Sequence, residues 1–208
     1  MKSRSRGFTL TELMIVLALA GVILAIGTPS FREFSRNNRM VTIANEFLGG
    51  VQTARTEAIK RQLASGGVAV CPSANPYDAS PTCLDDSTQQ FDGWIVFVDT
   101  NNDCTRDAAD ETEIVLRVGQ RIDLSNSATS YRKSNADGSC ISFAATGFTR
   151  TDTGRTAARH ALFCDERGNT TQPGTALSIA RGVEITATGR ARITRDVSEI
   201  AGWGMSCP

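Results

Sequence analysis

The sequence has few of the residues from which active sites and metal sites are built. It contains a single histidine, His160, and none of its six cysteines belongs to a C-x-x-C pair. A zinc site is therefore poorly supported, and acid–base chemistry would have to depend on carboxylates. The sequence also has no nucleophile elbow, phosphate-binding glycine loop or H-E-x-x-H segment. We therefore expect no catalytic residues, no enzyme activity and no metal centre.

Aromatic residues and net charge are low as well. Aromatic residues make up 6% of the chain and apolar residues 40%, which predicts a core built mainly from aliphatic side chains. The formal net charge is zero, but residues 1–7 contain three basic residues and no acid. The rest of the chain is therefore slightly acidic, and binding of an anionic partner would need a local basic patch.

The six cysteines all lie in the last two thirds of the chain. Their even number predicts three disulfides and an oxidising compartment, although many connectivities are possible and buried free thiols are the alternative. A bridge over a short proline-rich loop and a bridge that holds the C-terminal segment are the first two choices. The resulting pairs are Cys71–Cys83, Cys164–Cys207 and, by elimination, Cys104–Cys140.

An apolar run follows the basic N-terminus. Residues 8–26 contain one charged side chain, Glu12, and are long enough to cross roughly 30 Å of hydrocarbon as a helix. Lys2, Arg4 and Arg6 precede the run, so the positive-inside rule keeps that end cytoplasmic. Because no A-x-A-like cleavage site follows, we expect the run to be retained as a membrane-spanning helix.

Glu12 is unexpected within an apolar span. A carboxylate there costs about 2.5–3.5 kcal/mol on insertion scales, so it is interpreted as a functional residue that needs a partner. The cost becomes tolerable when a cation and a hydrogen bond meet the carboxylate. A plain signal anchor with an incidental glutamate is the alternative.

The residues around Glu12 resemble a known processing site. Residues 7–12 read Gly-Phe-Thr-Leu-Thr-Glu, which closely resembles the leader site of type IV pilins and type II secretion pseudopilins. The resemblance implies that a membrane prepilin peptidase cleaves after Gly7 and that the new terminal Phe8 is N-methylated. It also implies that Glu12 pairs with the terminal amine of a neighbouring subunit.

A second helical pattern follows Pro29, which is expected to kink or loosen the helix. One face of this pattern is formed by Met40, Ala44, Phe47, Val51, Ala54 and Ala58. We expect this face to pack on a sheet and the helix to end near residues 65–67, Ser-Gly-Gly. The predicted organisation is a leader at 1–7, a transmembrane and assembly helix at 8–28, an amphipathic helix at 29–65 and a β-rich head at 66–208.

The head is predicted to contain only short strands after the long helix. The expected strands are 68–71, 94–98, 113–118, 140–144, 161–164, 177–180, 183–187 and 190–194, with loop-rich stretches at 72–90 and 125–138. This order predicts an α+β fold in which a long helix packs on an antiparallel sheet. His160 is expected to be structural, at the edge of a strand.

Three segments of the head resemble one branch of the pilin family. They are residues 94–99 (Trp-Ile-Val-Phe-Val-Asp), 163–165 (Phe-Cys-Asp) and 188–193 (Thr-Gly-Arg-Ala-Arg-Ile). They are similar to the type II secretion protein H/FimT branch. Together with the leader, the resemblance covers essentially the whole chain.

The turn after residue 99 resembles the start of a calcium loop. Asp99, Asn101 and Asp103 offer oxygen ligands at alternate positions, but Cys104 stands where such a loop needs glycine, and Asp110 stands where it needs a bidentate glutamate. Because Asn and Asp also favour turns between strands, we prefer a hairpin turn, with calcium as the alternative.

A basic segment lies near the C-terminus. Gly189, Arg190 and Arg192 form a G-R-x-R pattern, and residues 181–195 contain four arginines and one acid. In an extended segment Arg190 and Arg192 would point to one side, and arginine suits phosphate contacts. The pattern resembles the DNA-contacting motif of FimT-type minor pilins that take up DNA for natural transformation. A turn glycine followed by two solvated arginines is the alternative.

These observations predict a minor pilin or pseudopilin of a type IV pilus or type II secretion system. It would be anchored in the bacterial inner membrane with its head in the periplasm, processed, and assembled with other pilins through its N-terminal helix. The alternative is a DNA-binding minor pilin. The leader is common to pili and pseudopili, so both machines remain open.

Overall fold

The structure is a computed structural model that describes residues 7–84, 93–119, 130–133, 140–150, 160–205 and 207. Of the predicted leader, only Gly7 falls within these ranges. The chain divides into two compact units, Met1–Arg39 and Met40–Pro208, and each is described by itself.

Helix α1, Leu10–Arg61, begins in the first unit and ends in the second, and it continues without interruption through Pro29. Proline has no N–H to donate, so the carbonyl of Ala25 loses its helical partner. Two hydroxyls flank this point: Thr28 Oγ1 donates to the Leu24 carbonyl at 2.6 Å, and Ser30 Oγ donates to the Ile26 carbonyl at 3.5 Å. α1 therefore runs through both predicted helical segments, 8–28 and 29–65.

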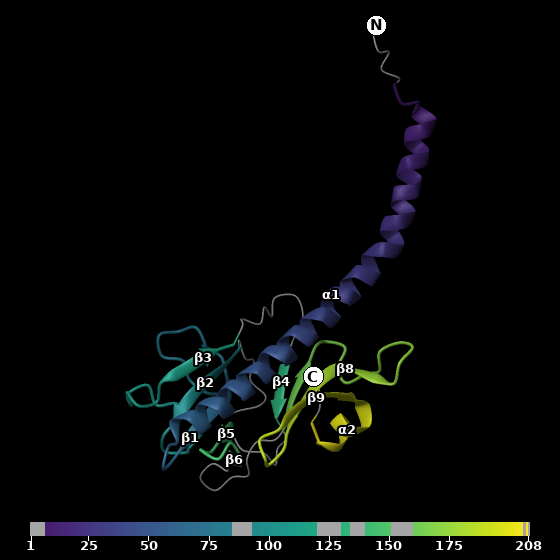
Figure 1. The fold of residues 1–208 in the computed structure, drawn as a ribbon. Coiled ribbons are helices and arrows are strands. Elements are labelled where there is room, and N and C mark those ends of the chain that lie inside the picture. The colour runs from purple at the N-terminus through teal and green to yellow at the C-terminus, as the bar shows by residue number, and fades with distance from the viewer. Residues whose placement is uncertain are drawn as a thin grey trace. The chain divides into compact units, whose positions relative to one another are not determined.

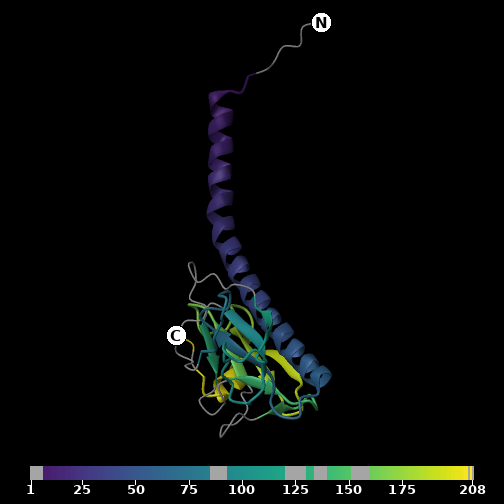
Figure 2. The same ribbon diagram turned by 90° about the vertical axis from the view of Figure 1, so that its left-hand side faces the viewer.

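The C-terminal part of α1 lies against the strands of the head, as both views show (Figures 1 and 2). Its predicted apolar face is confirmed: the six predicted positions are all buried, and Ile43 and Gly50 are buried beside them. Phe47 lies at the centre of this face, with edge-on ring contacts to Trp94 at 6.0 Å and to Phe163 at 5.2 Å. Helix and strands therefore share one core.

The strands of the described residues form two antiparallel sheets. The first has the order β3-β2-β1-β5-β6, and the second has the order β4-β7-β8-β9. The strands of the first sheet are β1 Gly67–Ser73, β2 Gly93–Asp99, β3 Val115–Val118, β5 Ile141–Phe143 and β6 Thr149–Arg150. Those of the second are β4 Ser130–Lys133, β7 His160–Cys164, β8 Leu177–Ile185 and β9 Ala191–Asp196. The predicted α+β class is confirmed.

Three elements were not expected from the sequence. Strand β4 lies within a stretch predicted as loop, β6 is a two-residue strand, and a short helix, α2 Val197–Gly202, follows β9 directly. The expectation that only strands follow the long helix is therefore wrong. The side chain of Asp196 caps α2 by accepting the N–H of Glu199, which is the role that Asp serves at helix starts.

Strand β8 also differs from the expectation of two separate strands. It is continuous over nine residues, but its register with β9 shifts between Leu177 and Gly182. Over that interval β8 moves from Leu177 to Gly182 while β9 moves only from Asp196 to Thr194, so β8 carries a bulge of several extra residues. The gap between the two expected strands, Arg181 and Gly182, lies at the end of this bulged interval.

The three predicted disulfides are confirmed. Cys71 pairs with Cys83, Cys104 with Cys140 and Cys164 with Cys207. The first two bridges belong to an apolar cluster on one side of the first sheet, and the third joins β7 to the segment that follows α2. Each disulfide stabilises the fold by lowering the conformational entropy of the unfolded chain.

Candidate functional site

The junction between Gly7 and Phe8 is accessible. Both residues precede α1 in non-helical backbone and are exposed, and no atom approaches within 4 Å of the position that a Cβ on Gly7 would occupy. The side chain of Phe8 is 79% exposed. A peptidase that reads an extended segment could therefore reach this bond without unfolding any described element.

Thr9 and Glu12 form the start of α1. The hydroxyl of Thr9 accepts the backbone N–H of Glu12 at 3.2 Å, which is the N-cap arrangement of a T-x-x-E sequence. The carboxylate of Glu12 has no partner among the described residues. The cap uses only the backbone N–H of Glu12, so it does not account for the carboxylate.

The first unit exposes a continuous apolar surface. Every large aliphatic, methionine or phenylalanine side chain from Phe8 to Phe34 is more than half exposed. α1 contains a window that is long and apolar enough to cross a membrane. Such a surface is too large for a soluble monomer and marks a membrane or protein interface.

The predicted basic motif lies at the turn between β8 and β9. Gly189 is buried with φ near +78°, and a Cβ there would overlap the carbonyl oxygen of Gly147. Arg55 of α1 holds the same corner, because its Nε donates to the Gly147 carbonyl at 3.0 Å and its second amino group donates to the Thr188 carbonyl at 3.2 Å. Gly189 is therefore a packing residue, and sequence reasoning missed Arg55.

Arg190 and Arg192 do not share one environment. Arg192 is paired with Glu184 on β8 at 2.7 Å and with Glu199 on α2. Hydrogen bonding to Glu199 and the charge of Glu184 hold the pKa of Arg192 above its usual value. Arg190 is exposed, has no acidic partner among the described residues, and lines a cavity of about 340 Å³ together with Arg55.

The other two arginines of the basic segment are also bound within the head. Arg181 is 4% exposed, and Arg195 donates to the carbonyl of Ser178 and to the side chain of Gln172. The predicted excess of cations is therefore smaller on the surface than in the sequence. Glu199, the second acid that pairs with Arg192, lies outside residues 181–195, the segment over which the charges were counted.

The Asp99 turn begins the connection between the antiparallel strands β2 and β3. Both carboxylate oxygens of Asp99 accept backbone N–H groups, from Asp103 and from Cys104, each at 3.2 Å. Burial raises the pKa of Asp99 to about 6, although these two hydrogen bonds oppose the shift. Asn101 donates to Asp103 at 2.9 Å, so the oxygens considered for calcium are engaged within the turn.

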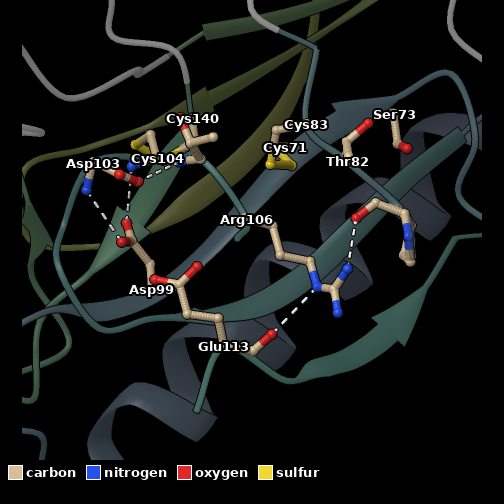
Figure 3. Close-up of a disulfide and its surroundings, with 12 residues drawn as sticks. Cys71, Ser73, Thr82, Cys83, Asp99, Asp103, Cys104, Arg106, Glu113 and Cys140 are labelled. Carbon is tan, nitrogen blue, oxygen red and sulfur yellow. Dashed lines mark hydrogen bonds between the residues drawn. A yellow bond between two sulfur atoms is a disulfide. The ribbon is translucent and has the colours of Figure 1, made fainter. Parts of the chain in front are cut away.

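Two more polar groups complete this hairpin. Glu113 is buried and accepts the N–H groups of Thr100 and Asp107, and Arg106 donates to the Glu113 carbonyl (Figure 3). Cys104 and Cys140 lie beside Asp99, but their sulfurs are bonded to each other. The arrangement orders the connection between β2 and β3.

His160 lies at the start of β7. Its ring stacks on Trp203 with centroids 4.6 Å apart. This contact agrees with the structural role predicted from its position.

Two family models match different parts of the chain, one in the head and one at the N-terminus. Residues 44–189 match the family model described as type II transport protein GspH, and residues 2–28 match the prokaryotic N-terminal methylation motif. No solved structure matches the chain.

Curated relatives match over part of the chain. The chain is 30% identical over 79 residues to the prepilin peptidase-dependent protein D of Escherichia coli, which covers 38% of this chain and 51% of that protein. It is 33% identical over 73 residues to a fimbrial protein of Pseudomonas aeruginosa, covering 35% and 44%. It is 39% identical over 54 residues to the type IV major fimbrial protein FimA of Dichelobacter nodosus, covering 26% and 34%. The matches thus span about half or less of these relatives.

Proposed function

Because the chain belongs to the GspH family of type IV pilin-like proteins, we propose that it is a minor pilin or pseudopilin. In this role it is a non-enzymatic subunit of a filament, in a type IV pilus or a type II secretion system. The observation that carries the proposal is the start of α1. There an accessible Gly7–Phe8 junction is followed by an exposed apolar helical segment with one carboxylate, Glu12.

Processing by a prepilin peptidase would convert the chain into its assembling form. One relative is named as prepilin peptidase-dependent, and the methylation motif spans the same residues. Cleavage after Gly7 leaves Thr9 in the mature chain, so the helix cap survives processing. The new amine of Phe8 would then lie close to the level of Glu12 on a neighbouring subunit.

The pairing of that amine with Glu12 accounts for the cost of the carboxylate. Within hydrocarbon, an unpaired carboxylate is expensive, and an oppositely charged group with a hydrogen bond offsets much of that cost. The pairing also fixes the axial position of one subunit on the next, because only one level of the apolar helix carries charge. We expect the anchor to be in the bacterial inner membrane and the disulfide-containing head in the periplasm.

In vivo cross-linking tests this function. A photoreactive residue in place of Leu17, which is exposed in the first unit, is expected to capture proteins that carry the same leader and apolar helix. A photoreactive residue at exposed Tyr77 in the head serves as the matched control. Capture of unrelated envelope proteins alone from position 17 would contradict assembly through the helix.

DNA binding is a second candidate function, supported by one observation. Arg190 is exposed beside Arg55 and has no acidic partner among the described residues. The two carboxylates that pair Arg192 count against a two-arginine phosphate contact. Of the predicted motif, Arg190 is therefore the residue better placed to reach a phosphate.

Salt-dependent binding of duplex DNA to the detergent-solubilised chain tests this candidate. Counterion release predicts that affinity falls steeply with salt, and that Arg190→Gln lowers the slope by about one contact. Arg192→Gln should have the smaller effect. Absence of binding at low salt, or equal slopes for the wild type and Arg190→Gln, would remove DNA binding from the account.

A further inference from the structure

The bulge of β8 contains an unusual buried guanidinium. Arg181 is 4% exposed, and its Nη1 donates to three successive carbonyls, those of Ser178, Ile179 and Ala180, at 3.1, 2.7 and 3.2 Å. These contacts explain how the bulge is held open. Nε and Nη2 of Arg181 have no acceptor among the described residues, so three of its five N–H donors are uncommitted.

A second guanidinium meets the first at one oxygen. Nε of Arg195 donates to the Ser178 carbonyl at 3.0 Å, the same oxygen that accepts Nη1 of Arg181. Two cationic groups thus converge on one carbonyl. Arg195 also donates to the Gln172 side chain at 2.7 Å, which orients its planar group, while its Nη1 has no acceptor among the described residues.

The nearby negative charge does not balance these cations. Asp165 is the acid that acts on Arg181, and it already holds Arg167 through both of its oxygens. Burial, followed by the charges of Arg195 and Arg167, lowers the pKa of Arg181 to about 10, so the group is still charged at neutral pH. The charge of Asp165, the acid that acts on Arg181, is therefore already engaged by Arg167.

Paired guanidinium groups with free donors are the arrangement that proteins use for oxoanions. Planar N–H forks match the oxygens of phosphate and sulfate, and partial burial strengthens each hydrogen bond to a charged acceptor. We propose that the β8 bulge is a binding site for a single small oxoanion of the phosphate or sulfate type, held by Arg181 and Arg195. The site is separate from the Arg190 corner and does not depend on the proposed filament role.

Calorimetric titration of the detergent-solubilised full chain with inorganic phosphate, at constant ionic strength set with chloride, tests this proposal. The wild type is expected to bind one phosphate per chain. Arg195→Gln should weaken binding at least ~10-fold, because it removes one of two charge-assisted forks. Arg190→Gln removes an exposed arginine elsewhere on the head, and it should leave the affinity within about twofold.

A second variant protects the test against misfolding. Arg195→Lys keeps the charge but loses the fork, and it is expected to weaken phosphate binding by a smaller factor than Arg195→Gln. Circular dichroism verifies that each variant is folded. No saturable binding by the wild type, or an equal loss in Arg190→Gln and Arg195→Gln, would overturn the proposal.

Discussion

The two units of this chain treat their apolar and acidic side chains in opposite ways. From Phe8 to Phe34 every large apolar side chain is more than half exposed, whereas the head buries its largest side chains, including Trp94 and Phe47. The single acid of the apolar run, Glu12, has no carboxylate partner among the described residues. In the head, the buried acids Asp99 and Asp165 have backbone or arginine donors.

The residues of the two units therefore serve different purposes. The head can satisfy its core and polar groups within one chain, so its residues mainly determine stability. The exposed part of α1 cannot do so, and its residues are explained only by a membrane or by other subunits. Substitutions in the first unit should therefore reduce assembly and leave the head stable. Substitutions in the head should reduce its stability and have less effect on assembly.

The largest effect is expected at Glu12. Glu12→Ala should be cleaved normally but should enter filaments at least ~10-fold less often, because the amine of the neighbouring subunit loses its counter-ion. Immunoblots of sheared filaments and of membranes measure the two pools. Glu33→Ala, which removes an exposed acid further along α1, is the matched control and should assemble as the wild type does.

Normal incorporation of Glu12→Ala would contradict the pairing role of the carboxylate. The backbone N–H of residue 12 still donates to the Thr9 hydroxyl in this variant, so the start of the helix is unchanged. A loss of head stability in Glu12→Ala would contradict the claim that residues of the first unit do not stabilise the head.

Loss of a disulfide should be the largest change within the head. In the chain-entropy account, removing Cys164–Cys207 costs about 4 kcal/mol of unfolding free energy and removing Cys71–Cys83 costs about 3 kcal/mol, because the second bridge closes a shorter loop. Urea unfolding of the two double Cys→Ala variants provides both values. A reversed order would show that strain or packing, rather than loop closure, dominates.

Gly189→Ala should destabilise the head by about 2–4 kcal/mol. The positive φ costs about 1 kcal/mol, and the overlap with the Gly147 carbonyl adds the remainder. Gly174→Ala is the control, since its φ is +77° but no atom lies within 4 Å of the added Cβ. Equal losses of stability in thermal unfolding would mean that the contact with Gly147 contributes nothing.

The smallest effect concerns pH. Asp99 has a folded-state pKa of about 6, above its usual value of 3.8, so the folded chain binds this proton more tightly than the unfolded chain. This group should therefore lower the free energy of unfolding by the order of 1–2 kcal/mol as pH rises from about 4 to about 6. The measurement is the difference in stability between the wild type and Asp99→Asn at pH 4.5 and 7.

The wild type should lose stability relative to Asp99→Asn on going to the higher pH. A difference that stays constant between the two pH values would mean that the Asp99 carboxylate is not penalised by burial.

Local patterns predicted much of this molecule. The apolar run, the leader residues and the helical face around Phe47 each depend on spacing along the chain, and spacing can be read directly. The disulfide pairs were chosen among several connectivities, and the structure confirms the choice. The capping pattern from Asp196 to Glu199 was equally local and would have predicted α2.

The environment of the arginines could not be read in the same way. Whether Arg192 is free depends on its register opposite Glu184 and on the placement of α2, and the burial of Arg181 depends on a bulge in β8. Both are consequences of strand pairing between distant segments. A common face of Arg190 and Arg192 therefore could not be predicted from their spacing alone.

The intact mass and N-terminal peptide of the chain recovered from membranes test the central claim most directly. The account predicts that residues 1–7 are missing and that the new terminal Phe8 carries a methyl group, with Glu12 retained. An intact Met1, or cleavage after the apolar run that removes Glu12, would contradict it.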